Sequence, residues 1–287
     1  MTAQTTIGID VAARRPCTCV LVVGLAVREW LDTKDLEELR SWVAGHQPDV
    51  VAVDAPCAPS KGLLLHPEAG SKPYGGRVCD LDLRRRGIPL YEVPRERADA
   101  DPWMETGFQI YDILRDLGYQ LPRESGIARS AIEVYPHASF VTLLGGTPAK
   151  KSTTLGQTQR LGVLRRHGLR LDTRVDPDSL DALVAALTAI RFLEDQASAV
   201  GEPEEALLWL PVDRPEDSYR RLPASTTPLE LAELDYLHRV LSPRERDALL
   251  QSLLIAAPRG GEAMIEILEQ LLLCHATEEL LREHEGV

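Results

Sequence analysis

The alternation of apolar and polar residues up to Pro211 predicts a series of short strands and amphipathic helices. Three strand-like segments near the start, the last two separated by a tight turn at Gly24 and Leu25, are typical of an antiparallel meander. A run that is apolar on both faces, residues 50–53, predicts a central strand covered on both sides. Strands are expected at residues 6–10, 17–23, 26–31, 50–53, 131–135 and 207–210, and helices at 32–45, 106–117, 154–166 and from 177 to about 190. This order predicts an α/β fold.

Local sequence signals define where several of these helices and loops begin and end. Asp176 followed by Pro177 is a strong helix start, and Gly45 is expected to end the first helix. Pro136 is expected to end the strand before it. Residues 56–101 are rich in Pro, Gly and Arg and predict long loops with short helices. Long loops beside a rigid sheet commonly carry function.

The chain changes character beyond Pro211. Residues 227–230 and 242–245 each match a capping box with Pro at the first helical position, and a further helix is expected at about residues 262–283. We therefore predict two domains, an α/β domain at residues 1–212 and an acidic, all-α extension at 213–287. The extension is interpreted as a surface for a protein partner.

Charge is distributed unevenly along the chain. The net charge is −12, but residues 201–287 hold 18 Asp and Glu against eight Lys and Arg, which leaves 26 against 24 for residues 1–200. Residues 123–174 hold nine basic and three acidic residues. This local positive balance fits a phosphate-rich partner such as DNA or RNA, although many basic helix faces are simply solvated.

Cysteine usage and hydropathy limit the class of protein. The five cysteines form no C-x-x-C pair, which argues against a disulfide framework or a zinc knuckle. No run approaches the roughly 20 apolar residues of a membrane span, and the start lacks the features of a secretory signal. We expect a cytoplasmic protein without a membrane segment.

Two aspartates stand where apolar strands end, Asp10 and Asp54. Parallel neighbouring strands present their carboxyl ends at the same edge, so these two carboxylates are expected to lie close together. At about 4 Å and an effective dielectric constant near 20, two such charges repel by roughly 4 kcal/mol. A bound Mg²⁺ or Mn²⁺ removes that repulsion, and a shared proton is the alternative.

Further candidate acids lie later in the chain. Asp178 and Asp181 are three residues apart and share one face of the helix that starts at Pro177. Asp178 also suits the positive end of the helix dipole without any ligand, and that explanation weakens for Asp181, which lies deeper, in the second turn. Glu133 is a further, less favoured candidate for catalysis. In the alternative interpretation, it is simply a charged residue on the polar side of an edge strand.

This acid set predicts hydrolysis of a phosphodiester, because two metal ions held by carboxylates activate water and stabilise the leaving oxygen. Arg77 and Arg84, in an arginine-rich loop segment, are candidates for phosphate contacts, and a solvated arginine run is the alternative. His137 is a third candidate for the substrate site, and a structural or capping role is its alternative.

Five motifs together resemble a known family. They are Ile7-Gly8-Ile9-Asp10, Ala52-Val53-Asp54-Ala55-Pro56, Arg77-Val78-Cys79-Asp80, Glu133-Val134-Tyr135-Pro136-His137-Ala138 and the stretch 179–189. In content and order, over about residues 5–211, they look like domain-of-unknown-function family 429, described as predicted nucleases with a ribonuclease H-like fold. The resemblance implies a mixed sheet whose first three strands are antiparallel.

By position, the resemblance also implies a Mg²⁺ or Mn²⁺ site at Asp10, Asp54 and Asp181. The pair of Asp178 and Asp181 is similar to the paired acids on the last catalytic helix of Holliday-junction resolvases.

Two other readings remain. Actin-like and sugar-kinase folds also open with an Ile-Gly-Ile-Asp strand, which suggests a nucleotide-dependent phosphotransferase, but no second Gly-rich phosphate loop occurs late in this chain. A non-catalytic binding module that recruits partners through its acidic helices is the other reading.

Overall fold

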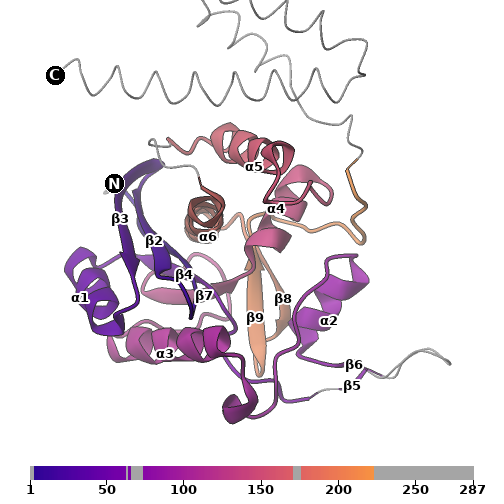
Figure 1. The fold of residues 1–287 in the computed structure, drawn as a ribbon, viewed down its shortest axis with the longest axis horizontal. Coiled ribbons are helices and arrows are strands. Elements are labelled where there is room, and N and C mark those ends of the chain that lie inside the picture. The colour runs from indigo at the N-terminus through magenta and orange to yellow at the C-terminus, as the bar shows by residue number, and fades with distance from the viewer. Residues whose placement is uncertain (1–2, 63, 66–73, 171–175, 223–287) are drawn as a thin grey trace, which may run out of the picture.

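A seven-stranded mixed sheet forms the centre of the protein, seen here in a computed structural model (Figure 1). The structure describes residues 3–62, 64–65, 74–170 and 176–222. The strands of the sheet lie in the order β3-β2-β1-β4-β7-β9-β8. Their bounds are β1 (Thr5–Asp10), β2 (Cys17–Val23), β3 (Ala26–Thr33), β4 (Val50–Asp54), β7 (Ser130–Val134), β8 (Ser198–Glu202) and β9 (Ala206–Leu210).

The direction of the strands changes at β1. On one side, β1, β2 and β3 pair antiparallel, as the predicted meander of three strands requires. On the other side, β1, β4, β7 and β9 run parallel, and β8 closes the edge antiparallel to β9. The mixed α/β sheet expected from the sequence is therefore confirmed. A separate two-stranded ribbon pairs β5 (Leu64–Leu65) with β6 (Tyr74–Gly75).

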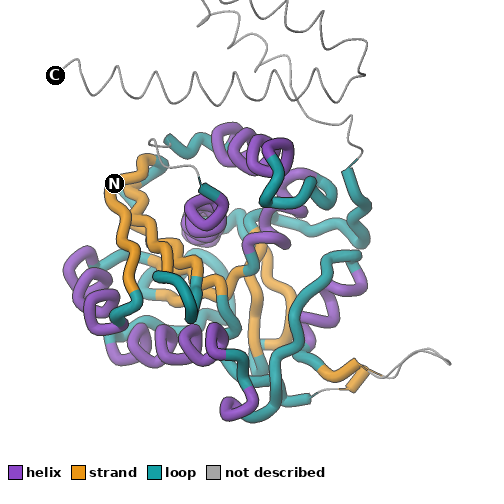
Figure 2. Tube along the Cα trace, in the orientation of Figure 1, coloured by secondary structure: helices purple, strands orange, loops and turns teal. Residues whose placement is uncertain are grey.

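Helices cover both faces of the sheet, as Figures 1 and 2 show. Their bounds are α1 (Leu36–His46), α2 (Val78–Arg85), α3 (Pro102–Asp116), α4 (Pro136–Leu144), α5 (Thr154–Arg166) and α6 (Pro177–Leu193), with a 3₁₀ turn at Arg97–Asp99. Helices α4, α5 and α6 lie on one face, and α1 and α3 lie on the other. Buried apolar side chains fill both layers.

Several helix boundaries follow the sequence, and others differ from it. The Asp176 side chain caps α6 by accepting hydrogen bonds from the backbone of Asp178 and Ser179, as predicted. Gly45 does not end α1, because the left-handed residue after the helix is Gln47, at φ 46°. Pro136 ends its strand but also begins α4, a helix that the sequence did not predict, and β8 was not predicted either.

Helix α6 crosses β1 at close range over Gly8. A Cβ placed on Gly8 would stand 2.0 Å from the carbonyl oxygen of Ala182 and 2.5 Å from the amide nitrogen of Ala186. Only a residue without a side chain fits such a contact, and the small residues of α6 extend it along the sheet. Because side chains alternate along a strand, Asp10 lies on the same face of β1 as Gly8 and faces α6.

The chain after β9 stays on the domain as far as residue 222. The backbone amide of Tyr219 donates to the carbonyl of Arg86, and Leu222 donates to Thr147. The Tyr219 side chain is buried against the main core. The predicted helical extension falls mainly on residues 223–287, outside the described residues, so the predicted boundary at 212 stays a prediction. Among the helices that the structure describes, none is long and apolar enough to cross a membrane.

We expect Gly8→Ala to destabilise the protein by about 3 kcal/mol or more, because the new methyl group overlaps the α6 backbone, which cannot rotate away as a side chain would. Urea unfolding measures the change. Gly45→Ala is the matched control: this glycine lies inside α1, and no atom lies within 4 Å of the place its new methyl group would take, so a gain of about 0.5–1 kcal/mol is expected. Equal effects of the two substitutions would contradict the close crossing.

Candidate metal and phosphate site

Asp10 and Asp54 are direct neighbours at the carboxyl edge of the sheet. The parallel register of β1 and β4 pairs Asp10 with Asp54, as the sequence predicted. Asp10 is buried, with 4% of its surface exposed, and Asp54 is partly buried. No hydrogen bond to the Asp54 carboxylate is found within the described residues. Two acidic side chains, one buried and one partly buried, thus stand side by side at this edge.

Helix α6 brings two more carboxylates to this edge. Asp181 lies one residue before Ala182, where α6 touches β1, and its side chain is largely buried. Asp178 lies one turn earlier in α6 and is more exposed. The sequence placed both on one helix face, and the packing of α6 turns that face toward Asp10.

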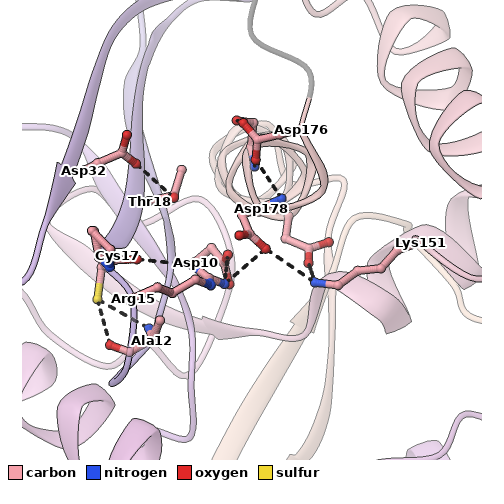
Figure 3. Close-up of polar contacts among 12 residues, drawn as sticks. Asp10, Ala12, Arg15, Cys17, Thr18, Asp32, Lys151, Asp176 and Asp178 are labelled. Atoms are coloured by element: carbon pink, nitrogen blue, oxygen red, sulfur yellow. Dashed lines mark hydrogen bonds and ion pairs between the residues drawn. The ribbon is translucent and has the colours of Figure 1, made fainter. Parts of the chain in front are cut away.

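Two basic residues that were not assigned to the site pair with these acids. Arg15, from the loop between β1 and β2, contacts Asp10 at 2.7 Å and Asp178 at 3.2 Å. Lys151, from the loop before α5, contacts Asp181 at 2.7 Å and Asp178 at 3.7 Å. Figure 3 shows Asp178 between Arg15 and Lys151. The acid cluster is therefore flanked by a cation on each side.

The electrostatics of the cluster favour uptake of a proton or a cation. Burial, followed by the charge of Asp181, raises the pKa of Asp10 from 3.8 to about 7, although Arg15 opposes the shift. Burial, followed by the charges of Asp10 and Asp181, raises the pKa of Asp54 well above its usual value. Burial also raises the pKa of Asp181, and Lys151 offsets part of this shift. The two cations thus leave the negative charge only partly compensated.

A cavity of about 620 Å³ opens beside the aspartates. Asp54 and Asp181 form part of its wall, and basic side chains form much of the rest. Burial, followed by the charge of Arg160, lowers the pKa of His137 to about 4, so this ring is neutral at pH 7. The residues that line the cavity are Asp54, Tyr135, Pro136, His137, Thr147, Pro148, Ala149, Lys150, Lys151, Ser152, Arg160, Asp181 and Arg221. Of the three predicted substrate residues, the structure places only His137 here.

Glu133 and Arg77 lie on the other side of the sheet. Ile132 and Val134 face α6, so Glu133 between them points to the opposite face. There, the fully buried Arg77 donates to both carboxylate oxygens of Glu133, at 2.8 and 2.6 Å. Arg77 also donates to Asp80 at 3.0 and 2.8 Å. The structure does not bring these residues to the strand-end aspartates, and their visible contribution is to packing.

Arg84, the remaining predicted contact for substrate, lies on α2. Its guanidinium donates to the carbonyl of Leu90 at 2.9 Å, and it is not part of the cavity wall. The sequence did signal Lys151 and Arg160, since both belong to the basic stretch 123–174. Nothing in the sequence marked Arg15 or Arg221, which reach the site from loops whose paths only the fold sets.

The donor set fits a hard divalent cation in chemistry. Mg²⁺ and Mn²⁺ prefer carboxylate oxygens, and Asp10, Asp54 and Asp181 offer three carboxylates whose pKa values are raised, chiefly by burial and in addition by neighbouring acids. As the side chains lie, no three His, Cys, Asp or Glu in the described part of the chain form a group that could hold a metal ion. Arg15 and Lys151 supply the positive charge in this arrangement, and a metal ion would compete with them.

We expect Glu133→Ala to destabilise the protein by about 3 kcal/mol or more, because it leaves the buried Arg77 guanidinium without its two-point partner. Urea unfolding is the measurement. Glu204→Ala is the control, since Glu204 pairs with Arg123 on the surface and should change stability by less than about 0.5 kcal/mol. Wild-type stability with abolished activity would instead make Glu133 a catalytic residue.

We expect Asp10→Asn to reduce the pH dependence of stability in metal-free protein. An acid whose pKa rises on folding binds more protons in the folded state between pH 4 and 7, so stability falls as the pH rises through this window. Relative to wild type, the variant should gain about 2 kcal/mol or more between pH 5 and pH 8. Thermal unfolding in chelator checks this. The exposed Asp116→Asn serves as control, and parallel curves for wild type and Asp10→Asn would contradict the raised pKa.

No curated protein and no solved structure matches the chain. The family model described as "Protein of unknown function (DUF429)" matches residues 8–206, which span β1 to the start of β9 and include every carboxylate of the cluster. This match covers well over half of the chain and agrees with the resemblance of the five motifs. The chain therefore belongs to the DUF429 family of proteins of unknown function.

Proposed function

We propose that this protein is a metal-dependent nuclease that hydrolyses phosphodiester bonds of DNA or RNA. The observation that carries the proposal is the meeting of three carboxylates from distant segments: Asp10 and Asp54 end neighbouring parallel strands, and Asp181 reaches the same edge from α6. A cavity with four basic side chains adjoins them. Carboxylates beside a cationic cavity are the parts that phosphodiester hydrolysis needs.

The order of the elements supports a ribonuclease H-like fold as part of this proposal. Three antiparallel strands are followed by parallel strands β4, β7 and β9, with helices on both faces. The acids come from the first strand, the fourth strand and a late helix. Membership of a family of unknown function does not itself assign an activity, so the proposal depends on the site.

Asp10, Asp54 and Asp181 would hold the Mg²⁺ or Mn²⁺. When bound, the metal supplies a lowered pKa for an attacking water and a positive charge for the phosphate oxygens. For these three carboxylates to hold a metal, Arg15 would give up its ion pair with Asp10 and Lys151 its ion pair with Asp181. Both side chains are long and exposed over 40% and 49% of their surface, so they can swing aside with little repacking.

The residues of the chain then have distinct tasks. Lys151, released from Asp181, lies at the cavity wall, where its ammonium group balances charge on the phosphate. Arg15 remains beside Asp178 at the opposite end of the cluster and limits its negative charge. His137 is neutral at pH 7, so it contributes a hydrogen bond to the substrate rather than a charge.

The ion pairs also favour a second candidate function, a non-catalytic module that binds nucleic acid. Arg15 and Lys151 already neutralise Asp10 and Asp181, and the described residues hold no ready group of three metal ligands. In that case the cluster serves stability, and the cavity serves binding alone. Metal binding separates the two functions.

We expect purified protein with Mn²⁺ to cleave at least one of three substrates, namely single-stranded, duplex and branched nucleic acid. Asp54→Asn should lower the rate by about 100-fold or more, a change of about 2.7 kcal/mol in the activation barrier, because the variant loses a metal ligand with no other partner. In parallel, a Mn²⁺ concentration of 100 times the Kd should stabilise wild type by about 2.7 kcal/mol, and Asp54→Asn much less.

The exposed Asp116→Asn is the control and should match wild type in both measurements. Absence of cleavage together with equal Mn²⁺ stabilisation of wild type and Asp54→Asn would refute the nuclease. Nucleic-acid binding that persists without any metal effect would support the non-catalytic module.

A further inference from the structure

The cavity beside the aspartates contains a buried cation that forms no ion pair with any residue the structure describes. Arg160, on α5, is 4% exposed and lines the cavity. Its Nη1 donates to the carbonyls of Ala149 and Gly156, at 2.9 and 2.7 Å, and its guanidinium stacks over Phe140 at 5.3 Å from the ring centre. Within the described residues, its Nε and Nη2 donate no hydrogen bond and no acid lies within ion-pair distance.

Such an arrangement is unfavourable without an anion. A buried charge needs a partner, and burial lowers the pKa of Arg160 from its usual value, a shift that the charge of Asp181 offsets only in part. Arg77, the other deeply buried arginine described above, is held by two carboxylates. The difference between the two marks Arg160 as a binding group rather than a packing group.

A helix end points at the same space. Tyr135, Pro136 and His137, at the start of α4, line the cavity, and no side chain caps this helix. Uncapped backbone N–H groups at a helix start attract phosphate. Lys150 and Arg221 add two exposed cations at the rim. Donors from separate elements thus converge on a place for one anionic group.

The cavity also offers an aromatic wall. The rings of Tyr135 and His137 lie 5.8 Å apart at 65°, and the Tyr135 hydroxyl is held by the carbonyl of Pro89. Nucleobases stack on such side chains in single-stranded complexes. The volume of about 620 Å³ falls in the range of small-molecule sites, about 300–1,000 Å³, so it suits one nucleotide.

We infer that this cavity binds one nucleotide of a single-stranded substrate, with its phosphate on Arg160 and the start of α4 and its base against Tyr135. This inference rests on the proposed function and specifies its substrate as a strand end or an unpaired nucleotide. Lys151 links the two sites, because it lines the cavity and pairs with Asp181. The phosphate of the bound nucleotide therefore lies next to the carboxylates.

The test measures binding of adenosine 5′-monophosphate to the full chain in chelator, by calorimetry. Wild type should bind it, and Arg160→Gln should bind it at least tenfold more weakly. The control is Arg166→Gln, which should bind the nucleotide as tightly as wild type, because Arg166 is exposed on the same helix and does not line the cavity. Tyr135→Leu should weaken binding of the nucleotide but not of inorganic phosphate. Asp181→Asn should strengthen binding severalfold, since it removes a negative charge and frees Lys151.

Equal affinity of folded Arg160→Gln and wild type, or no binding by wild type at millimolar nucleotide, would overturn the inference. Should Arg160→Gln fail to fold, the double variant Lys150→Gln, Arg221→Gln at the rim replaces it. We expect this double variant to bind the nucleotide at least threefold more weakly than wild type. Equal affinity would overturn the inference.

The two proposals fail separately. Nucleotide binding that depends on Arg160, in a protein that cleaves nothing with Mn²⁺, refutes the nuclease and keeps the nucleotide site. If wild type cleaves single-stranded substrate and Arg160→Gln cleaves it with the same KM, the nucleotide site is refuted and the nuclease is kept.

Discussion

The contact between α6 and β1 at Gly8 is the constraint on which the site depends. Only the absence of a side chain at Gly8 lets the α6 backbone reach the strand, and Ala182 and Ala186 complete the fit. That contact sets the height and rotation of the helix, and it thereby sets where Asp181 stands relative to Asp10 and Asp54. Close packing of the interior transmits this placement, since a well-packed helix has no other position to occupy.

Buried charged side chains are compensated to different degrees on the two faces of the sheet. On one face, Arg77 is fully enclosed and satisfied by Glu133 and Asp80, an arrangement that is rigid and closed to solvent. On the other face, the aspartates lie beside a cavity, with half-exposed cations as partners and raised pKa values. Satisfied networks stabilise a fold, whereas under-compensated groups beside a cavity are typical of functional sites.

Prediction succeeded where local signals and tertiary demands agree. The strands 17–23 and 50–53 and the start of α6 at Asp176 were recognised because β-branched runs and a capping aspartate each specify one local structure. It failed at α4, because Pro136 is a strand breaker and a good first helical residue at once. It failed also at β8, whose segment 198–202 contains glycine and glutamate and is a strand only through pairing with β9.

The sequence by itself determined the order of the elements, the strand-end positions of Asp10 and Asp54 and the shared helix face of Asp178 and Asp181, because these follow from periodicity and capping. Only the tertiary structure decided which charges meet. The elements that pack around an arginine decide whether carboxylates pair with it, as with Arg77, or whether it lines a cavity, as with Arg160. Pairing between residues that lie 30 to 60 positions apart leaves no periodic pattern in the sequence. The cavity that joins Asp54 and Asp181 to the basic wall likewise exists only once α4, α5 and the loop before α5 have folded over the sheet.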